Sequence, residues 1–212
     1  MNSFPPLLLL HDGGDNGVWE PILDKLPGFV QVAVVDMPAV HRAGVPRLAD
    51  LLADRARELG LEAPHVVGHA LGGAVALELA RRMPVSGVTA FCPIGFWTRS
   101  HAWYMAVRFR LSCDPARLLA TSDIQAARDA AGRVAGMWRY AFRHPESITA
   151  PVLLAWAMRD RLVPPTDANR ARRRLPQARQ VMIPSGGHLV THDDPTTVAA
   201  VLFDWHQKIS GN

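Results

Sequence analysis

The sequence predicts an α/β fold: about six mostly parallel strands flanked by helices, in a single domain over residues 1–212. Short apolar runs alternate with longer amphipathic segments along the chain, which is typical of this class. Each run is apolar at consecutive positions, as expected for parallel strands that are covered on both faces. The composition, 49% apolar and 20% charged, is that of an ordinary globular protein with its own core.

The elements follow in order along the chain. The expected strands are Leu7–Leu10, Val30–Val35, His65–Val67, Val88–Cys92, Val152–Ala157 and Gln180–Ile183. The expected helices between them are Val18–Leu26, Arg47–Leu59, Gly72–Arg82, Thr166–Leu175 and Pro195–Ile209. In the second of these helices leucines recur at helical spacing, and the last begins with a proline after two aspartates. Strands joined in this way by helices predict a parallel sheet.

One segment interrupts the alternation. From Pro93 to Ala150 a long stretch separates two strands that a single helix would otherwise join. It contains most of the aromatic residues and several helix-like pieces, namely Trp103–Leu111, Pro115–Leu119 and Ile124–Phe142. Because long insertions in compact domains are usually functional, we predict a small helical lid over about 94–148.

Charge and cysteine usage exclude some classes of protein. From Arg99 to Arg179 there are 15 Arg against six acids, but no basic stripe with interleaved aromatics that would predict nucleic-acid binding. The excess is typical of a solvated helical face, with an anionic substrate or partner as the alternative. The early apolar run Pro5–Leu10 is too short for a signal peptide or a membrane span. The two cysteines imply no disulfide framework, so a cytoplasmic protein is expected.

A turn after the third expected strand reads Gly68-His69-Ala70-Leu71-Gly72-Gly73. Strand, sharp turn and helix in this order is the geometry of a nucleophile elbow, G-x-S-x-G. Glycines at 68 and 72 suit a tight turn in which the helix packs close to the strand. The N–H of Leu71, at the helix start, would point at a developing oxyanion. The nucleophile position itself holds Ala70, whose methyl group cannot attack a carbonyl.

Two further residues lie where a catalytic triad would need them. Asp160 follows the strand Val152–Ala157, and His188 lies on a Gly-rich loop after the last strand. Because the carboxyl ends of parallel strands meet at one edge of the sheet, both residues are expected near Ala70. A histidine is a fitting general base, since its ordinary pKa is close to neutrality. Asp160 would orient the ring of His188 and stabilise its charged form.

These motifs together resemble the α/β-hydrolase superfamily over nearly the whole chain. The segment Leu8-Leu9-Leu10-His11-Asp12-Gly13-Gly14, followed by Trp19, is similar to the His-Gly oxyanion loop of the family. The segment Val34-Val35-Asp36-Met37-Pro38 is similar to its Asp-x-Pro/Arg-Gly segment. The resemblance implies a compact α/β-hydrolase fold with an oxyanion hole formed by Gly13 and Leu71.

The elbow resembles the family pattern Gly-His-Ser-x-Gly-Gly, and the acid and base of the family carry over to Asp160 and His188. This implies a small-molecule substrate with an ester-like carbonyl group and no cofactor. The sequence departs from the pattern at Asp12, which replaces a glycine, and in the loop 39–44. Ala70 is the third departure, in place of the nucleophilic serine.

Substrate contacts are expected from Trp97 and Trp103, near the start of the lid, and from Val163, which follows Asp160 closely. His11 and His69 are expected to shape the backbone rather than to catalyse. The remaining histidines show no ligand spacing with cysteines or acids, so no metal site is expected. No nucleic-acid or membrane partner is expected, and no oligomeric state follows from the sequence.

Ala70 leaves three interpretations open. We favour an engineered Ser→Ala variant of an ester-hydrolysing enzyme, which would be inactive or impaired because loss of a nucleophilic serine costs about 10⁶ in kcat. Alternatively, Ala is natural and His188 with Asp160 forms a base dyad that acts on water or on a substrate proton. Aminoacrylate-hydrolase-like members of the superfamily also show Gly-His-Ala-Leu-Gly here. The third interpretation is a pocket that binds a ligand without chemistry. Ester, thioester, amide and carbon–carbon cleavage all remain open.

Overall fold

The computed structural model describes residues 4–11, 16–37, 44–98, 100–101, 103, 142 and 144–211. Its strands form one six-stranded sheet in the order β2-β1-β3-β4-β5-β6, with parallel pairing throughout. The strands are β1 Leu7–His11, β2 Val32–Asp36, β3 His65–His69, β4 Gly87–Phe91, β5 Val152–Ala157 and β6 Arg179–Ile183. The predicted six-stranded parallel sheet is confirmed, and β5 has the predicted bounds.

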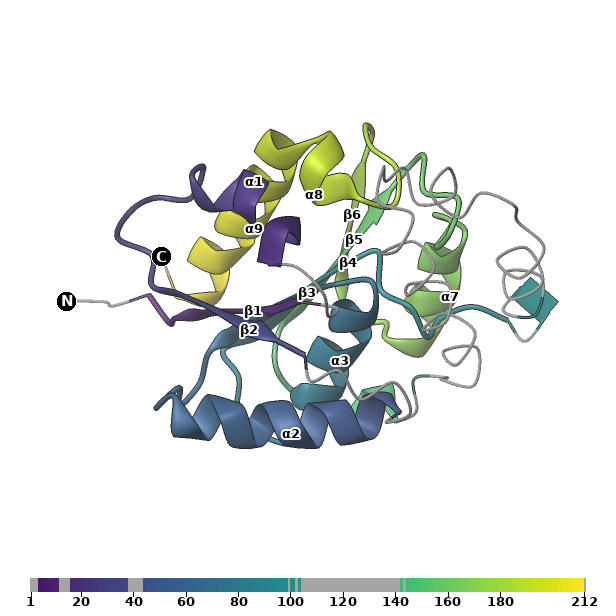
Figure 1. Ribbon diagram of the computed structural model, residues 1–212. Coiled ribbons are helices and arrows are strands. Elements are labelled where there is room, and N and C mark those ends of the chain that lie inside the picture. The colour runs from purple at the N-terminus through teal and green to yellow at the C-terminus, as the bar shows by residue number, and fades with distance from the viewer. Residues whose placement is uncertain are drawn as a thin grey trace.

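Helices cover both faces of this sheet. They are η1 Asn16–Val18, α1 Glu20–Leu23, α2 Val45–Glu58, α3 Leu71–Leu79, η2 Pro145–Ser147, α7 Asp167–Arg174, α8 Val190–Asp193 and α9 Pro195–Ile209. Figure 1 shows α2 and α3 on one face and α1, α8 and α9 on the other. In the described part of the chain, no helix is long and apolar enough to cross a membrane.

Prolines explain where two helices differ from the prediction. Helix α1, Glu20–Leu23, is shorter than the predicted Val18–Leu26: it begins later because Pro21 fits only a first turn, and Pro27 disfavours helical backbone at Leu26. Helix α2 begins at Val45, two residues before the predicted start, because Pro46 takes a first-turn position. Helix α9 has the predicted bounds.

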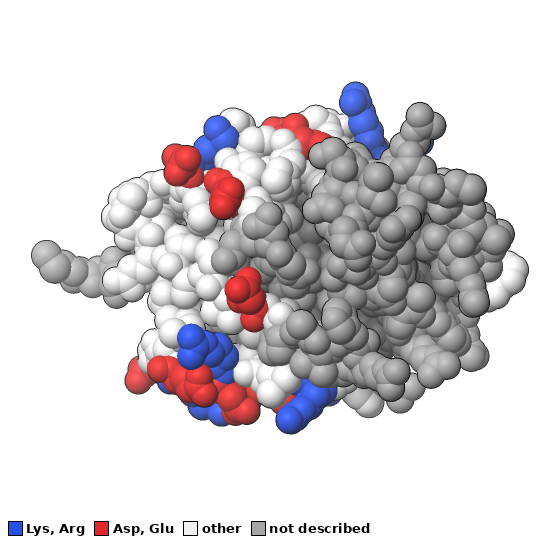
Figure 2. All heavy atoms as spheres, viewed as in Figure 1, with Lys and Arg blue, Asp and Glu red and all other residues white. Residues whose placement is uncertain are grey.

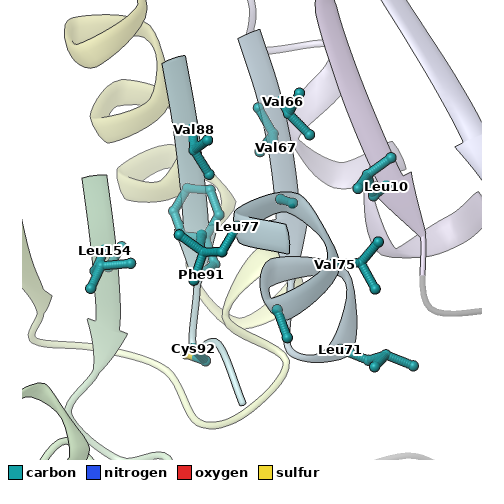
Figure 3. Close-up of a cluster of buried hydrophobic side chains, with 14 of the residues drawn as sticks. Leu10, Val66, Val67, Leu71, Val75, Leu77, Val88, Phe91, Cys92 and Leu154 are labelled. Atoms are coloured by element: carbon teal, nitrogen blue, oxygen red, sulfur yellow. The ribbon is translucent and has the colours of Figure 1, made fainter. Parts of the chain in front are cut away.

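The core fills both faces of the sheet, and its part nearest the elbow lies between α3 and the central strands. All residues of β3, β4 and β5 are buried, as is every residue of α3. Figure 3 shows this cluster, with side chains of α3 among those of the neighbouring strands. The indole of Trp19 is also fully buried and donates to the carbonyl of Leu10 at 3.2 Å. The carboxyl ends of β3, β4 and β5 are therefore anchored in a buried core.

The predicted lid, 94–148, falls mostly outside the described residues, and so do most of its three predicted helical pieces. The lid and the single-domain arrangement therefore stay predictions. Of the described residues in this segment, Phe96 and Phe142 are buried with ring centroids 5.9 Å apart.

On the face in Figure 2, acidic and basic side chains lie together along the lower edge, where α2 runs.

Candidate active site

The turn between β3 and α3 has the geometry of a nucleophile elbow. Ala70 adopts φ 50° and ψ −110°, a conformation that costs a non-glycine residue about 1–3 kcal/mol. Hydrogen bonds hold it from three sides: its N–H donates to Phe91 O at 2.9 Å, and its carbonyl accepts from Ala74 at 3.2 Å and from Ile94 at 3.3 Å. The surrounding structure thus maintains the strained turn, although its central side chain is only a methyl group.

The glycines of the elbow are required by close backbone approaches. A Cβ at Gly68 would lie 2.1 Å from the carbonyl oxygen of Gly72, and a Cβ at Gly72 would lie 2.8 Å from that of Leu10. Both distances are shorter than any real Cβ contact. The expected reason for these glycines, a helix packed close to its strand, is confirmed.

His188 and Asp160 meet across the carboxyl edge of the sheet. His188 Nδ1 lies 2.9 Å from Asp160 Oδ2, and the Asp160 side chain is fully buried. The other carboxylate oxygen, Oδ1, accepts hydrogen bonds from the N–H groups of Leu162 and Val163, each at 2.8 Å. These two backbone hydrogen bonds fix Oδ1, while Oδ2 faces the imidazole.

The electrostatics favour an ionised Asp160. Burial alone would raise its pKa, but the interaction with His188 and the two backbone N–H groups outweigh burial and hold the pKa below its ordinary value. Because an ionised carboxylate only accepts hydrogen bonds, the proton of the neutral His188 ring lies on Nδ1. Nε2 is then the ring nitrogen that can accept a proton.

Backbone contacts join the two loops that carry these residues. Met158 donates to Ile183 O at 3.0 Å, and Arg159 donates to Gly186 O at 3.2 Å. Gly186 has φ 87°, which favours glycine, and its neighbour Gly187 donates to Asp193 Oδ2 at 2.6 Å. The two glycines before His188 thus form the turn of the loop: Gly186 by its positive φ, and Gly187 by its hydrogen bond to Asp193.

Two further residues at this edge had no catalytic role in the sequence prediction. His69, the last residue of β3, directs Nε2 at the carbonyl oxygen of His188 over 2.6 Å. Cys92, which directly follows β4 (Figure 3), is buried with φ 46°. Burial first, and then the charge of Asp160, raise the pKa of this thiol well above its ordinary value. No local pattern in the sequence signals either contact.

The other predicted site residues are placed as follows. Leu71 is the first residue of α3, where a helix has backbone N–H groups without helical partners, but Gly13 lies outside the described residues. Trp97 is buried, whereas Trp103 is 68% exposed. Val163 is fully buried and contributes its N–H to Asp160. Within the described ranges, no group of three or more His, Cys, Asp or Glu could hold a metal ion.

Curated relatives match nearly the whole chain. A protein named "Putative carbamate hydrolase RutD" from Escherichia coli (strain K12 / DH10B) is 28% identical over 91% of this chain and 87% of its own length. A protein of the same name from Pantoea ananatis (strain LMG 20103) is 26% identical over 92% of this chain and 86% of its own length.

Solved structures share the fold at lower identity. A lipase-like protein (lip1) from Acinetobacter baumannii AYE superposes with a TM-score of 0.76 and 19% identity, over 99% of this chain and 86% of that chain. A thermophilic esterase from Thermogutta terrifontis gives a TM-score of 0.70 and 22% identity, over 97% of this chain and 90% of that chain.

The model of the alpha/beta hydrolase family matches residues 7–201, which is most of the sequence. With its parallel sheet and its elbow, this chain belongs to the alpha/beta hydrolase family.

Proposed function

We propose that this chain hydrolyses a small carbonyl substrate of the carbamate class, with His188 as the general base that activates water and Asp160 as the carboxylate that supports His188. The observation that carries the proposal is the 2.9 Å contact between His188 Nδ1 and the buried, ionised Asp160, next to an elbow that holds Ala70. A methyl group at position 70 rules out an acyl-enzyme there, so water must be the nucleophile.

The reaction needs one proton carrier and one anion-stabilising group. His188 Nε2 takes a proton from water while the water oxygen bonds to the carbonyl carbon, and Asp160 stabilises the resulting imidazolium. The N–H groups of Leu71 and, as predicted from the sequence, of Gly13 would donate hydrogen bonds to the carbonyl oxygen and stabilise the negative charge that develops on it. The carbon–nitrogen bond then breaks, and the leaving amine takes the proton from His188. The other product is carbonic acid or its half-ester.

The substrate class comes from the relatives, two of which carry the name of a carbamate hydrolase at 26% and 28% identity. The chemistry agrees with that class, because attack of water on a carbamate yields an amine and carbonic acid or its half-ester without any covalent enzyme intermediate. The buried pair of His188 and Asp160 supports this attack, since a carboxylate beside a neutral histidine keeps the ring in the tautomer that accepts a proton at Nε2.

A second candidate is an ester hydrolase whose serine at position 70 has been replaced. It is favoured by the φ of 50° at Ala70, because this strained turn is the one that exposes the nucleophile in an elbow. In that case the present chain would be impaired, and the serine form would pass through an acyl-enzyme.

The test compares methyl carbamate, followed by ammonia release, with p-nitrophenyl acetate, followed by nitrophenol release. We expect the unchanged chain to hydrolyse the carbamate, His188→Ala to lose at least about 100-fold in kcat, and Ala70→Ser to bring no gain. His192→Ala is the matched control, because this histidine is exposed on α8, and it should retain full activity.

Other outcomes would overturn the proposal. A large gain of ester hydrolysis in Ala70→Ser that disappears in the double variant with His188→Ala would establish the second candidate instead. Absence of turnover on both substrates in both forms, with either compound bound tightly, would leave a binding protein without chemistry.

A further inference from the structure

We propose that His69 is a positioning residue that fixes the main chain of His188 relative to the elbow. The inference rests on the proposed function insofar as His188 is taken as the general base. His69 Nε2 lies 2.6 Å from the carbonyl oxygen of His188, and the ring centroids of the two residues are 4.9 Å apart. His69 is 3% exposed, so water competes little for this bond.

The chemistry of the contact sets the direction of the hydrogen bond. A carbonyl oxygen only accepts, so Nε2 of His69 carries the proton and donates it to His188. A proton committed in this way cannot be passed to a substrate without breaking the bond. The geometry therefore favours a role for His69 in positioning the main chain of His188 over a role in proton transfer.

The contact joins two parts of the fold that are far apart in sequence. His69 is the last residue of β3 and directly precedes Ala70, whereas His188 lies on the loop between β6 and α8. The other loop contacts described above, from Arg159 and Asp193, come from segments after β5 and β6. The bond from His69 thus ties the loop to the strand that carries the elbow.

Two attachment points then define the position of the base. Asp160 holds the ring of His188 at Nδ1, and His69 holds its carbonyl group. With both in place, the distance between His188 Nε2 and position 70 is set by the frame of the sheet. Since a misplacement of about 1 Å can cost roughly 100-fold in rate, the second attachment would matter for catalysis.

The test uses two substitutions that separate the donor from the ring. In His69→Gln the side-chain amide nitrogen reaches about as far as Nε2 and can still donate, whereas His69→Phe keeps a ring but has no donor. We expect His69→Phe to lower kcat for methyl carbamate by roughly 10- to 100-fold with KM within about twofold, and His69→Gln to stay within a few-fold of the unchanged chain.

A readout independent of turnover is the downfield proton resonance of His188 Nδ1, which Asp160 accepts. It is assigned by its absence in His188→Gln. We expect this resonance to broaden or disappear in His69→Phe and to persist in His69→Gln. Thermal unfolding accompanies each variant, and His69→Leu, which is smaller and also lacks a donor, replaces His69→Phe should the latter fail to fold.

The two proposals fail in different ways. If no variant turns over the carbamate but the resonance is lost without the donor and kept with glutamine, the proposed function is wrong and the positioning role stands. If the donor-free variant keeps both kcat and the resonance, or if glutamine and phenylalanine are equally damaging, the positioning role is wrong.

Discussion

Nδ1 of His65 lies 3.0 Å from Nδ1 of His206, at the opposite end of β3 from the candidate active site. Both residues are fully buried, their rings are stacked with centroids 5.2 Å apart, and His65 Nε2 lies 2.8 Å from Thr89 Oγ1. One ring must donate to the other, so at least one Nδ1 is unprotonated. Burial and then the charge of His206 lower the pKa of His65 well below 6.5, and burial lowers the pKa of His206 to about 4.

This pair predicts a loss of stability in mild acid. Because the folded pKa values lie below the unfolded value, the unfolded chain binds more protons, and stability falls as pH drops from about 6.5 toward 4. Urea unfolding should show that His206→Gln removes roughly 2 kcal/mol of this pH-dependent loss. His192→Gln, at an exposed position, is the control and should leave the dependence unchanged. An unaltered pH dependence in His206→Gln would contradict the prediction.

A buried carboxylate joins α3 to α2. Glu78 accepts from Arg81 at 2.7 Å and from Arg82 at 2.8 Å, and Arg82 Nε also binds Asp50 of α2 at 2.6 Å. Glu78→Gln would leave two arginines without their buried counter-charge, so we expect a loss of roughly 2 kcal/mol in the free energy of unfolding.

The matched control for Glu78 is Glu58→Gln in the exposed pair with Arg55, whose side chains are 63% and 53% accessible. Exposed pairs contribute little, so this variant should change stability by less than about 0.5 kcal/mol. Equal effects of the two substitutions in urea unfolding would show that burial of Glu78 is not what matters.

The elbow tolerates no side chain at Gly68. An added Cβ would meet the backbone oxygen of Gly72 at 2.1 Å, and neither strand nor helix can move without disturbing the core. We expect Gly68→Ala to unfold the protein or to lose more than about 4 kcal/mol, measured by soluble yield and urea unfolding. Gly28→Ala, where no atom lies within 4 Å, should stay within about 0.5 kcal/mol. A folded Gly68→Ala protein of ordinary stability would disprove the close approach.

Local patterns were sufficient for most of the fold. Each strand contains an apolar run, and the start of α9 is marked by Pro195 after Asp194, whose side chain accepts from Thr197 N at 3.1 Å. The short helix α8 was missed because it is a single turn, and its end at Asp193 is held by a contact with Gly187 in the loop that precedes it. A single turn of helix is too short to show helical periodicity in the sequence.

The candidate site, too, could be predicted only in part from the sequence. Asp160 and His188 could be predicted because each follows a strand, and parallel strands end at one edge. The bond from His69 to His188 spans 119 residues and depends on how the last loop closes, so only the structure brings the two together. Cys92 lies beside Asp160 because β4 and β5 are neighbours in the sheet, and this strand order also comes only from the structure.

Asp160→Asn tests the tautomer that the proposed mechanism requires. Asparagine can still accept from the N–H groups of Leu162 and Val163, so the loop should keep its shape. Its amide NH₂ would then face His188 Nδ1 and favour the ring with the proton on Nε2, which cannot take a proton from water. We expect kcat for methyl carbamate to fall by roughly 10³- to 10⁴-fold with the fold intact.

The same substitution changes the response to acid. Since the pKa of Asp160 is below its ordinary value in the folded chain, the carboxylate contributes stability above about pH 3.8 that is lost as pH falls through the folded pKa. Asp160→Asn should lack this acid-sensitive part of the stability. Asp204→Asn, in the exposed pair with Lys208, should match the unchanged chain both in kcat and in the pH dependence of stability.

A kcat of Asp160→Asn within tenfold of the unchanged chain would mean that His188 does not depend on Asp160, because the proposed step requires the imidazolium to be stabilised by a charge at this position.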